Sequence, residues 1–151
     1  MYKRQFGNKE QLFRKALDRY QTGPQSFLTE ALRQPTARAV AEAIFSGFVR
    51  MQRDRDKPRG CLIVSGALAC GEEAETVRRE LAQLRQAAVT ALRERFERAV
   101  QDGDLPKGTD CAGLARYVAT VLNGLAVQAA SGATEKDLRL VSARAMQAWP
   151  S

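Results

Sequence analysis

The chain has 151 residues, with 24 lysine and arginine residues against 17 aspartate and glutamate residues, so its formal net charge is +7. With 44% hydrophobic and 27% charged residues, it has the composition of one globular domain that can bury a core without disulfides or a metal. It contains no histidine. This excludes every catalytic triad that depends on histidine, and most zinc and haem sites.

The excess positive charge lies in two short segments. Residues 1–20 contain six basic and two acidic side chains, and residues 50–59 contain five basic and two acidic ones. Two interpretations are open for each segment. One is a solvated charged face, which we favour for residues 50–59. The other is contact with a polyanion, of which nucleic acid is the first candidate because its phosphates attract lysine and arginine.

Taken in chain order, nearly every segment repeats its hydrophobic residues at the period of a helix, which predicts an all-α fold. Asn8 can cap a first helix, which Gly23-Pro24 interrupts; its apolar face carries Leu12, Phe13, Ala16, Leu17 and Tyr20. A short helix over 26–33 follows. A longer helix begins near Pro35, runs into the basic segment and is ended by Pro58 and Gly60.

The apolar run over 61–70 fits either a buried strand or a short buried helix. Because the sequence offers no partner strand, we favour the helix. The run is about half as long as a membrane span requires, and the charged N-terminus shows no signal-peptide pattern. These observations predict a cytosolic protein with no membrane segment. Residues 72–101 form the longest predicted helix, and 102–106 a turn.

Two further helices, from Thr109 or Asp110 to Gly132 and from Thr134 to Trp149, complete the chain. The first is apolar on one stripe and rich in alanine on the next, so more than one of its sides must be covered. In a small domain the second cover is often another copy of the chain. We therefore predict a homodimer packed as a four-helix bundle, with the interface residues Leu114, Val118, Val121, Leu122, Leu125, Leu138, Val141 and Ala145.

The string Phe6-Gly7-Asn8-Lys9-Glu10-Gln11-Leu12-Phe13, followed by Ala16-Leu17 and Tyr20, resembles a segment of the tetracycline-repressor (TetR/AcrR) family of transcription regulators. In that family the string joins the DNA-recognition helix to the linker helix of the ligand domain. Arg59-Gly60-Cys61-Leu62 is similar to an element found in a subset of these regulators. The resemblance implies a ligand-binding and dimerisation domain over 8–151, in a bacterial cytoplasmic repressor that a small molecule releases from DNA.

The resemblance also implies that the family's N-terminal helix-turn-helix is largely missing. Residues 1–7 are then a remnant of the recognition helix, and the string Met1-Tyr2-Lys3-Arg4-Gln5 is interpreted as a scar of cloning or sequence assembly. On this reading the chain alone does not bind an operator specifically, and DNA contact requires the missing unit. Lys9 matches the linker-helix lysine that contacts a DNA phosphate in the family.

In this family a ligand enters a pocket of the regulatory domain and shifts the linker helix. Aromatic, methionine and aliphatic side chains suit a small apolar or aromatic effector. The candidates in this sequence, each of which is alternatively a core residue, are Phe45, Phe48, Met51, Cys61, Leu62, Ser65, Leu84, Leu92 and Tyr117. Tyr117 and Asn123 either direct a polar group at the ligand or bond to a backbone carbonyl.

The three cysteines, Cys61, Cys70 and Cys111, are odd in number and have no CxxC spacing, so neither a disulfide framework, nor a metal site, nor another cofactor is expected. Cys61 is either a redox or electrophile sensor, as in some regulators of the family, or a small buried hydrophobe, which we favour. The acidic residues at 72, 73 and 75 look like a helix-start cluster rather than a catalytic pair. We predict no enzymatic activity. The alternative function is a helical dimeric adaptor that does not bind DNA.

Overall fold

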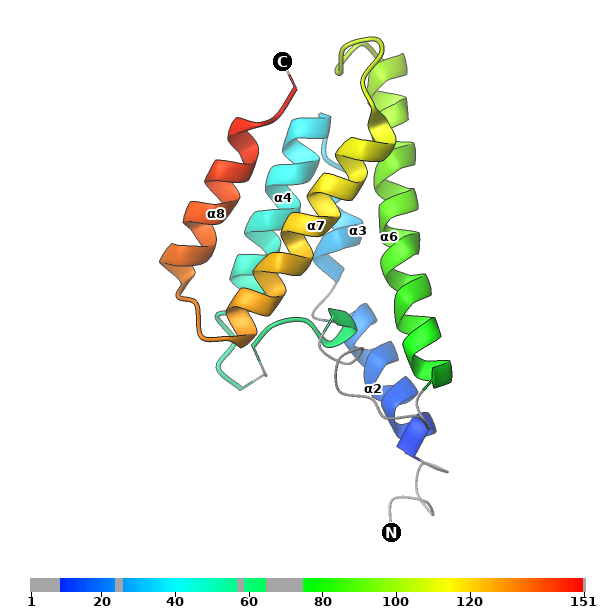
Figure 1. Cartoon of the computed structure of the whole chain (residues 1–151), viewed down its shortest axis with the longest axis vertical. Coiled ribbons are helices and arrows are strands. Elements are labelled where there is room, and N and C mark those ends of the chain that lie inside the picture. Colours follow the sequence, from blue (N-terminus) through cyan, green and yellow to red (C-terminus); the bar gives the residue numbers. More distant parts are fainter. Residues whose placement is uncertain (1–8, 24–25, 57–58, 65–74, 151) are drawn as a thin grey trace.

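The computed structural model describes residues 9–23, 26–56, 59–64 and 75–150. Over these ranges the chain forms the helices α2 (Lys9–Thr22), α3 (Phe27–Ala31), α4 (Ala37–Met51), α6 (Glu75–Gln101), α7 (Cys111–Ala130) and α8 (Glu135–Gln147) (Figure 1). In the apolar run over 61–70, residues 62–64 are helical, as favoured from the sequence, and residues 65–70 lie outside the described ranges. No strand occurs within the described ranges, and the predicted all-α class is confirmed there. None of the helices described combines the length and apolarity needed to cross a membrane.

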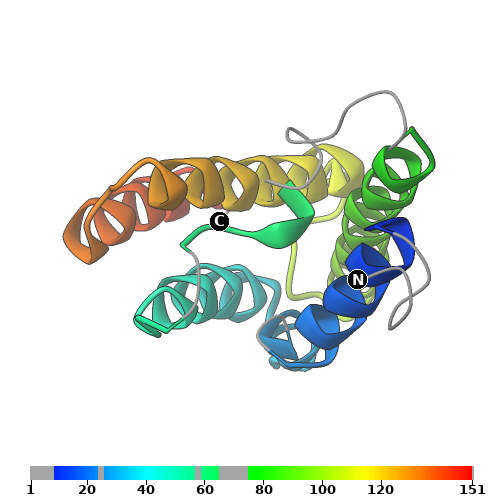
Figure 2. The same ribbon diagram turned by 90° about the horizontal axis from the view of Figure 1, so that it is seen from below.

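Helix α4 is the centre of the bundle and contacts α3, α6, α7 and α8. It occupies this place because its apolar residues cover more than one side; eight of its residues are buried, namely Ala37, Val40, Ala41, Ile44, Phe45, Gly47, Phe48 and Val49. Seen from below, α4 and α7 face each other and the segment 59–64 crosses between them (Figure 2). This segment therefore lies at the centre of one end of the bundle.

Side-chain caps set the starts of the later helices. Asp110 accepts a hydrogen bond from the Gly113 amide at 2.9 Å and begins α7. Thr134 and Asp137 exchange side-chain and backbone hydrogen bonds in a full capping box at the start of α8. Both starts agree with the sequence prediction. The predicted start of the long helix at residue 72 lies outside the described residues, within which α6 begins at Glu75.

Helix α4 runs into the basic segment as predicted but ends at the second residue of that segment, Met51, rather than near Pro58 and Gly60. The Gln52 side chain accepts a hydrogen bond from the Gly60 amide at 2.7 Å and donates one to the Gly60 carbonyl at 3.1 Å. These two hydrogen bonds bring Gln52, just after the helix, close to Gly60, so the chain returns towards the end of α4. Gly60 has a positive φ of 100°, and a Cβ there would lie 3.1 Å from the Ala126 carbonyl oxygen. Only glycine fits this close approach to α7.

The buried side chains form two separate clusters. The main core lies around α4 and includes Phe45, Phe48 and Phe96. The second, which we call the α2 cluster, consists of Leu17 of α2, Ile63, and Val77 and Leu81 of α6; Phe13, Tyr20, Cys61, Leu62 and Leu84 pack against it. An ion pair of 2.6 Å between Arg14 and Glu80 lies on the same α2–α6 contact. Helix α2 is thus held to the bundle by a small core of its own.

Candidate functional site

A mostly aliphatic cavity of about 90 Å³ lies among α3, α4, α6, α7 and the segment 59–64. Two of its wall residues are polar, Arg85 from α6 and Asn123 from α7. The full wall is Leu28, Leu32, Ile44, Ile63, Leu84, Arg85, Ala88, Ala91, Leu92, Ala119, Leu122 and Asn123. A mostly apolar wall with few polar groups is typical of small-molecule sites, although this cavity is smaller than most of them.

The cavity brings together two of the nine residues predicted for the ligand, Leu84 and Leu92. Phe45 and Phe48 are instead buried in the main core, and Met51 packs against it. Cys61 and Leu62 pack against the α2 cluster. Ser65 lies outside the described residues.

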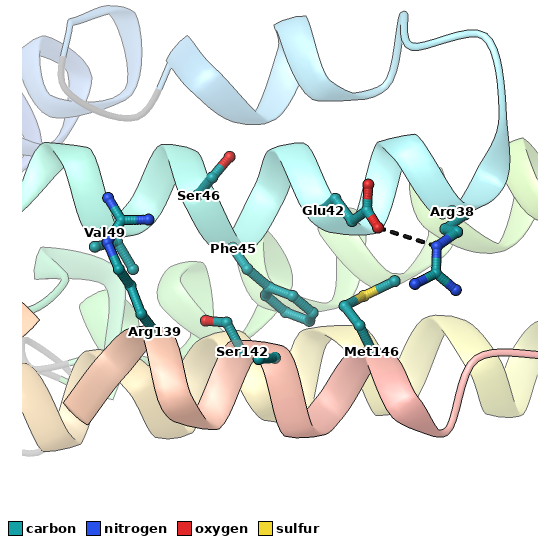
Figure 3. A pocket seen from close by; sticks show the side chains of 9 residues that line it. Arg38, Glu42, Phe45, Ser46, Val49, Arg139, Ser142 and Met146 are labelled. Atoms are coloured by element: carbon teal, nitrogen blue, oxygen red, sulfur yellow. Dashed lines mark hydrogen bonds and ion pairs between the residues drawn. The ribbon is translucent and has the colours of Figure 1, made fainter. Parts of the chain in front are cut away.

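Phe45 lies at the base of a different depression, an open groove of about 370 Å³ between α4 and α8 (Figure 3). Its ring lies between the helices beside Ser142 and Met146, and the Arg38–Glu42 ion pair, 3.0 Å long, stands at the rim. Phe45 is only 2% exposed, so the groove offers little aromatic surface to a ligand. The enclosed, aliphatic cavity beside α6 is the better candidate site.

The two polar residues noted on α7 behave differently. The Tyr117 hydroxyl donates a hydrogen bond of 2.9 Å to the backbone carbonyl of Ala145 in α8, so it serves the structure of the bundle. Asn123 lines the cavity. The sequence pattern alone could not separate these two roles, because both residues interrupt the same apolar helix.

Arg85 is a site residue that the sequence prediction missed. Its half-buried guanidinium donates a hydrogen bond of 3.0 Å to the backbone carbonyl of Ile63. Ile63 belongs both to the cavity wall and to the α2 cluster. Little in the sequence singles out Arg85, because it is one of many alternating charges in α6, a pattern typical of a solvated helix face. Its place between Leu84 and Ala88, beside the apolar stripe, was the one available signal.

Cys61 lies where the two clusters meet and packs against both. Burial, followed by the neighbouring Cys61, raises the pKa of Tyr20 above its ordinary value of 10.0, so the phenol keeps its proton. A nearby cation could lower the pKa of a thiol, and Arg59 and Lys57 are close to Cys61 in the sequence. Arg59 donates instead to the Ala133 carbonyl at 2.7 Å, and Lys57 lies outside the described residues. These contacts favour the buried-hydrophobe interpretation of Cys61.

The basic segment is tied to the turn between α7 and α8. Besides the Arg59 bond, Arg53 forms an ion pair of 2.5 Å with Glu135, which also pairs with Arg139 at 2.8 Å. Hydrogen bonds from Arg53 and then Arg139 lower the pKa of Glu135 to about 2. Part of the positive charge that suggested a polyanion is therefore already paired within the chain.

The predicted dimer residues separate into buried and exposed sets. Four of them lie in the chain's own main core: Val118, Leu125, Leu138 and Ala145. Leu114, Val121 and Leu122 are partly buried and pack against that core. Val141 is 46% exposed, together with Val127 at 44% and Leu140 at 61%. We call Val127, Leu140 and Val141 the outer apolar patch; it lies on α7 and α8, the two helices that were predicted to dimerise.

Lys9 is the first residue of α2, but its side chain is not among those described, and neither are the Asn8 cap or residues 1–7. The predicted phosphate contact and the proposed scar therefore fall outside the described structure. No cluster of three or more metal-ligating side chains occurs in the part of the chain that is described.

Comparison with known proteins gives consistent matches. A sequence model described as "Tetracyclin repressor-like, C-terminal domain" matches residues 39–149. The HTH-type transcriptional repressor ComR of Escherichia coli (strain K12) is 23% identical over 152 residues, which cover 97% of this chain and 70% of ComR.

Two solved structures are also similar. The TetR family transcriptional regulator CifR, in a cysteine mutant complexed with 26bp double-strand operator DNA, has a TM-score of 0.89 and 39% identity, and the match covers 98% of this chain and 78% of that chain. A TetR-type regulator from Rhodococcus sp. RHA1 has a TM-score of 0.73 and 38% identity, over 98% of this chain and 79% of that one. These matches span nearly the whole chain. They do not support the expectation that a helix-turn-helix has been lost.

Proposed function

The chain belongs to the tetracycline repressor-like (TetR) family of transcription regulators, which are DNA-binding proteins rather than enzymes, and we propose that it forms the ligand-sensing and dimerising body of a repressor that a small molecule releases from operator DNA. The observation that carries this proposal is the position of the cavity beside the α2 cluster. Ile63 and Leu84 take part in both. The occupancy of the cavity and the position of α2 are therefore coupled through shared side chains.

This coupling can act as a switch. A ligand that fits the cavity better when α2 has shifted stabilises the shifted arrangement by its difference in affinity. Because α2 is held by a small cluster rather than by the main core, it is the element whose position changes at least cost to the bundle. In CifR, 39% identical to this chain, the regulator is seen on operator DNA; a shift of α2 is proposed to end the corresponding contact here.

Dimerisation is proposed to use the outer faces of α7 and α8. The outer apolar patch, Val127, Leu140 and Val141, comprises the exposed large hydrophobic residues of the described structure. Exposed large apolar side chains on two helices that pack together are available for an interface, and a second copy is the simplest partner. A charge at Leu122 or Leu125 would not test this surface, since Leu125 is buried and Leu122 lines the cavity.

The dimer is tested with Val141→Asp, which places a charge in the outer apolar patch. We expect the unmodified chain to sediment as a dimer at tens of micromolar and Val141→Asp to sediment as a monomer. Ala87→Asp is the matched control, because Ala87 is an exposed residue of α6 away from the patch. A monomeric unmodified chain, or equal behaviour of the two variants, would contradict the proposed interface.

The regulatory role is tested with the protein expressed from its complete reading frame. Selection from a library of random DNA duplexes, followed by anisotropy titrations at several salt concentrations, should recover a preferred sequence whose binding exceeds that of unrelated DNA at each salt concentration. A dimer that binds no duplex specifically would overturn the proposal in favour of the helical adaptor.

A further inference from the structure

We propose that the effector is a carboxylate on a compact apolar body, and that its carboxylate binds Arg85 in place of the Ile63 carbonyl. The inference rests on the proposed function, since it specifies the ligand of that cavity and the contact through which the ligand acts. It rests on two observations: Arg85 is the single cation in the aliphatic wall of the cavity, and it donates a hydrogen bond to the Ile63 carbonyl.

The composition of the wall indicates the charge of the ligand. Arg85 from α6 and Asn123 from α7 line a cavity whose other members are leucine, isoleucine and alanine. An uncharged apolar ligand would bury the guanidinium with only the neutral Ile63 carbonyl as a partner, and burying its charge without a counter-charge costs free energy. A carboxylate matches the guanidinium fork with two parallel hydrogen bonds. Because the wall holds a single cation, a monoanion fits it better than a doubly charged phosphate.

Arg85 differs from other arginines of α6 in its surroundings. Arg79 pairs with Glu75 and Arg93 pairs with Glu97, both exposed, and the partly buried Arg78 also pairs with Glu75. Arg85 is half-buried, and no ion pair joins it to a carboxylate of the residues described. Its bond of 3.0 Å to the Ile63 carbonyl is a contact with a neutral acceptor. A charged acceptor competes well against a neutral one for the same guanidinium.

The size of the cavity indicates a short ligand. It holds about 90 Å³, whereas an apolar cavity of roughly 150 Å³ accepts benzene. The cavity as it stands therefore suits an acid with fewer heavy atoms than benzene, such as acetate or propionate, and longer acids or an aromatic ring require side chains to give way. Branched and unbranched short-chain acids are the first ligands to examine.

The hydrogen bond between Arg85 and the Ile63 carbonyl also explains how binding of such a ligand would affect α2. The Ile63 carbonyl accepts from Arg85, while the Ile63 side chain, 6% exposed, packs with Leu17 of α2. When a ligand carboxylate takes the guanidinium, the segment that carries Ile63 loses the bond that fixes it to α6. The α2 cluster then loosens on the side facing the cavity. Arg85 would thus both bind the ligand and, through the Ile63 carbonyl, hold in place the segment against which α2 packs.

Affinity for matched acids and alcohols tests the ligand class. We would titrate the protein by calorimetry with propionate, butyrate and isovalerate, each against the alcohol of the same skeleton. At least one acid should bind about tenfold tighter than its alcohol, the ratio expected for a charge-assisted hydrogen bond. Arg85→Met should bring the ratio close to one. Arg79→Met, which removes an exposed arginine of the same helix, should leave it unchanged.

Two outcomes would overturn the assignment: equal affinity of every acid and its alcohol in the unmodified protein, or the same preference for the acid in Arg85→Met. If circular dichroism shows that Arg85→Met does not fold, the ratio is measured in Arg85→Gln, which keeps a donor for the Ile63 carbonyl. There too a ratio near one is expected, and a retained preference for the acid refutes the role of Arg85.

Hydrogen exchange tests whether the bond between Arg85 and the Ile63 carbonyl holds α2 in place. With the acid at saturation, the backbone amides of α2 should exchange faster than with no ligand, and Arg85→Met without ligand should show the same acceleration. Unchanged or slower exchange in α2 with the site occupied would refute this role of the bond. Neither measurement involves DNA. A failure here therefore leaves the proposed regulatory function standing with another ligand, while a failure to bind an operator leaves these results intact.

Discussion

The hydroxyl of Tyr117 donates a hydrogen bond of 2.9 Å to the backbone carbonyl of Ala145, and so joins α7 to α8 across their contact. The acceptor lies in the last turn of α8, where the carbonyls of a helix have fewer partners within the helix itself. The bond fixes how the two C-terminal helices lie against each other. These are the helices that carry the outer apolar patch.

Removing this hydroxyl should weaken the fold by a modest amount. Tyr117→Phe is expected to lower the free energy of unfolding by about 1 kcal/mol, because it leaves the Ala145 carbonyl without its side-chain donor. Urea unfolding can be followed through Trp149, the single tryptophan, whose ring packs edge-on against Phe96 at 5.6 Å between centroids. Thr120→Ala, at an exposed site on the same helix, should change stability by less than about 0.5 kcal/mol; an equal loss in both variants would refute the assignment.

Arg95 should be the most sensitive charged residue of α6. It is 7% exposed and donates to the backbone carbonyls of Leu32 at 3.2 Å and Gln34 at 2.8 Å, where the chain leaves α3. Arg95→Met leaves both carbonyls unpaired, so we expect a loss of about 3 kcal/mol. Thermal or urea unfolding measures it, with the exposed Arg98→Met as the matched control. Similar stability of the two variants would show that water replaces the guanidinium.

Replacing Gly47 by alanine should lower the stability of the fold. A Cβ on this residue of α4 would lie 2.8 Å from the ring of Phe27 in α3, closer than real Cβ contacts. Overpacking outweighs the gain in helix propensity, and Gly47→Ala should cost about 1–2 kcal/mol. Gly124→Ala in α7, whose Cβ would meet nothing within 4 Å, is the control. Both are best measured in the Val141→Asp background, where dimerisation does not contribute; a neutral Gly47→Ala would contradict the prediction.

Acid should detach the basic segment from α8. Glu135 has a pKa of about 2 in the folded chain against an ordinary value of 4.5. A lowered pKa means that the ionised carboxylate stabilises the fold above pH 4.5, and that this contribution is lost as the pH falls from 4.5 towards 2. The melting temperature of the unmodified protein should therefore exceed that of Glu135→Gln at neutral pH, and the two should converge near pH 2.

The control for this pH series is Glu42→Gln. Glu42 pairs with Arg38 on the exposed side of one helix, so its loss should matter less at every pH. A difference between Glu135→Gln and the unmodified protein that stays constant down to pH 2 would rule out the carboxylate as its source.

The helices themselves could be predicted from the sequence because their signals are local. The Asp110 cap and the Thr134–Asp137 capping box depend on residues within one turn, and both occur where predicted. The end of α4 could not be predicted in this way. It depends on Gln52 reaching Gly60, a contact that closes only when the loop has folded.

A sequence does not reveal which element covers an apolar helix face. Val118, Leu125 and Leu138 form apolar stripes, and a stripe reveals that a face is covered without revealing by what. Here α4 and the rest of the main core cover it, and the outer apolar patch is made of other residues. The same limit applies to the ligand site: Phe45 and Phe48 fill the core, while the cavity lies where small side chains such as Ala88 and Ala119 leave space.

The division of the interior into a main core and an α2 cluster separates two properties that natural selection acts on. Substitutions around Phe45 or Phe96 should mainly change the stability of the fold, whereas, on the proposed function, substitutions around Leu17 or Ile63 should change how much ligand is needed for a response. The stability of the fold and the ligand concentration needed for a response could therefore change independently. On that proposal, wall positions outside the main core, such as Leu84 and Ala88, could alter ligand specificity with little loss of stability, whereas Ile44 and Leu92 belong to both the wall and the main core.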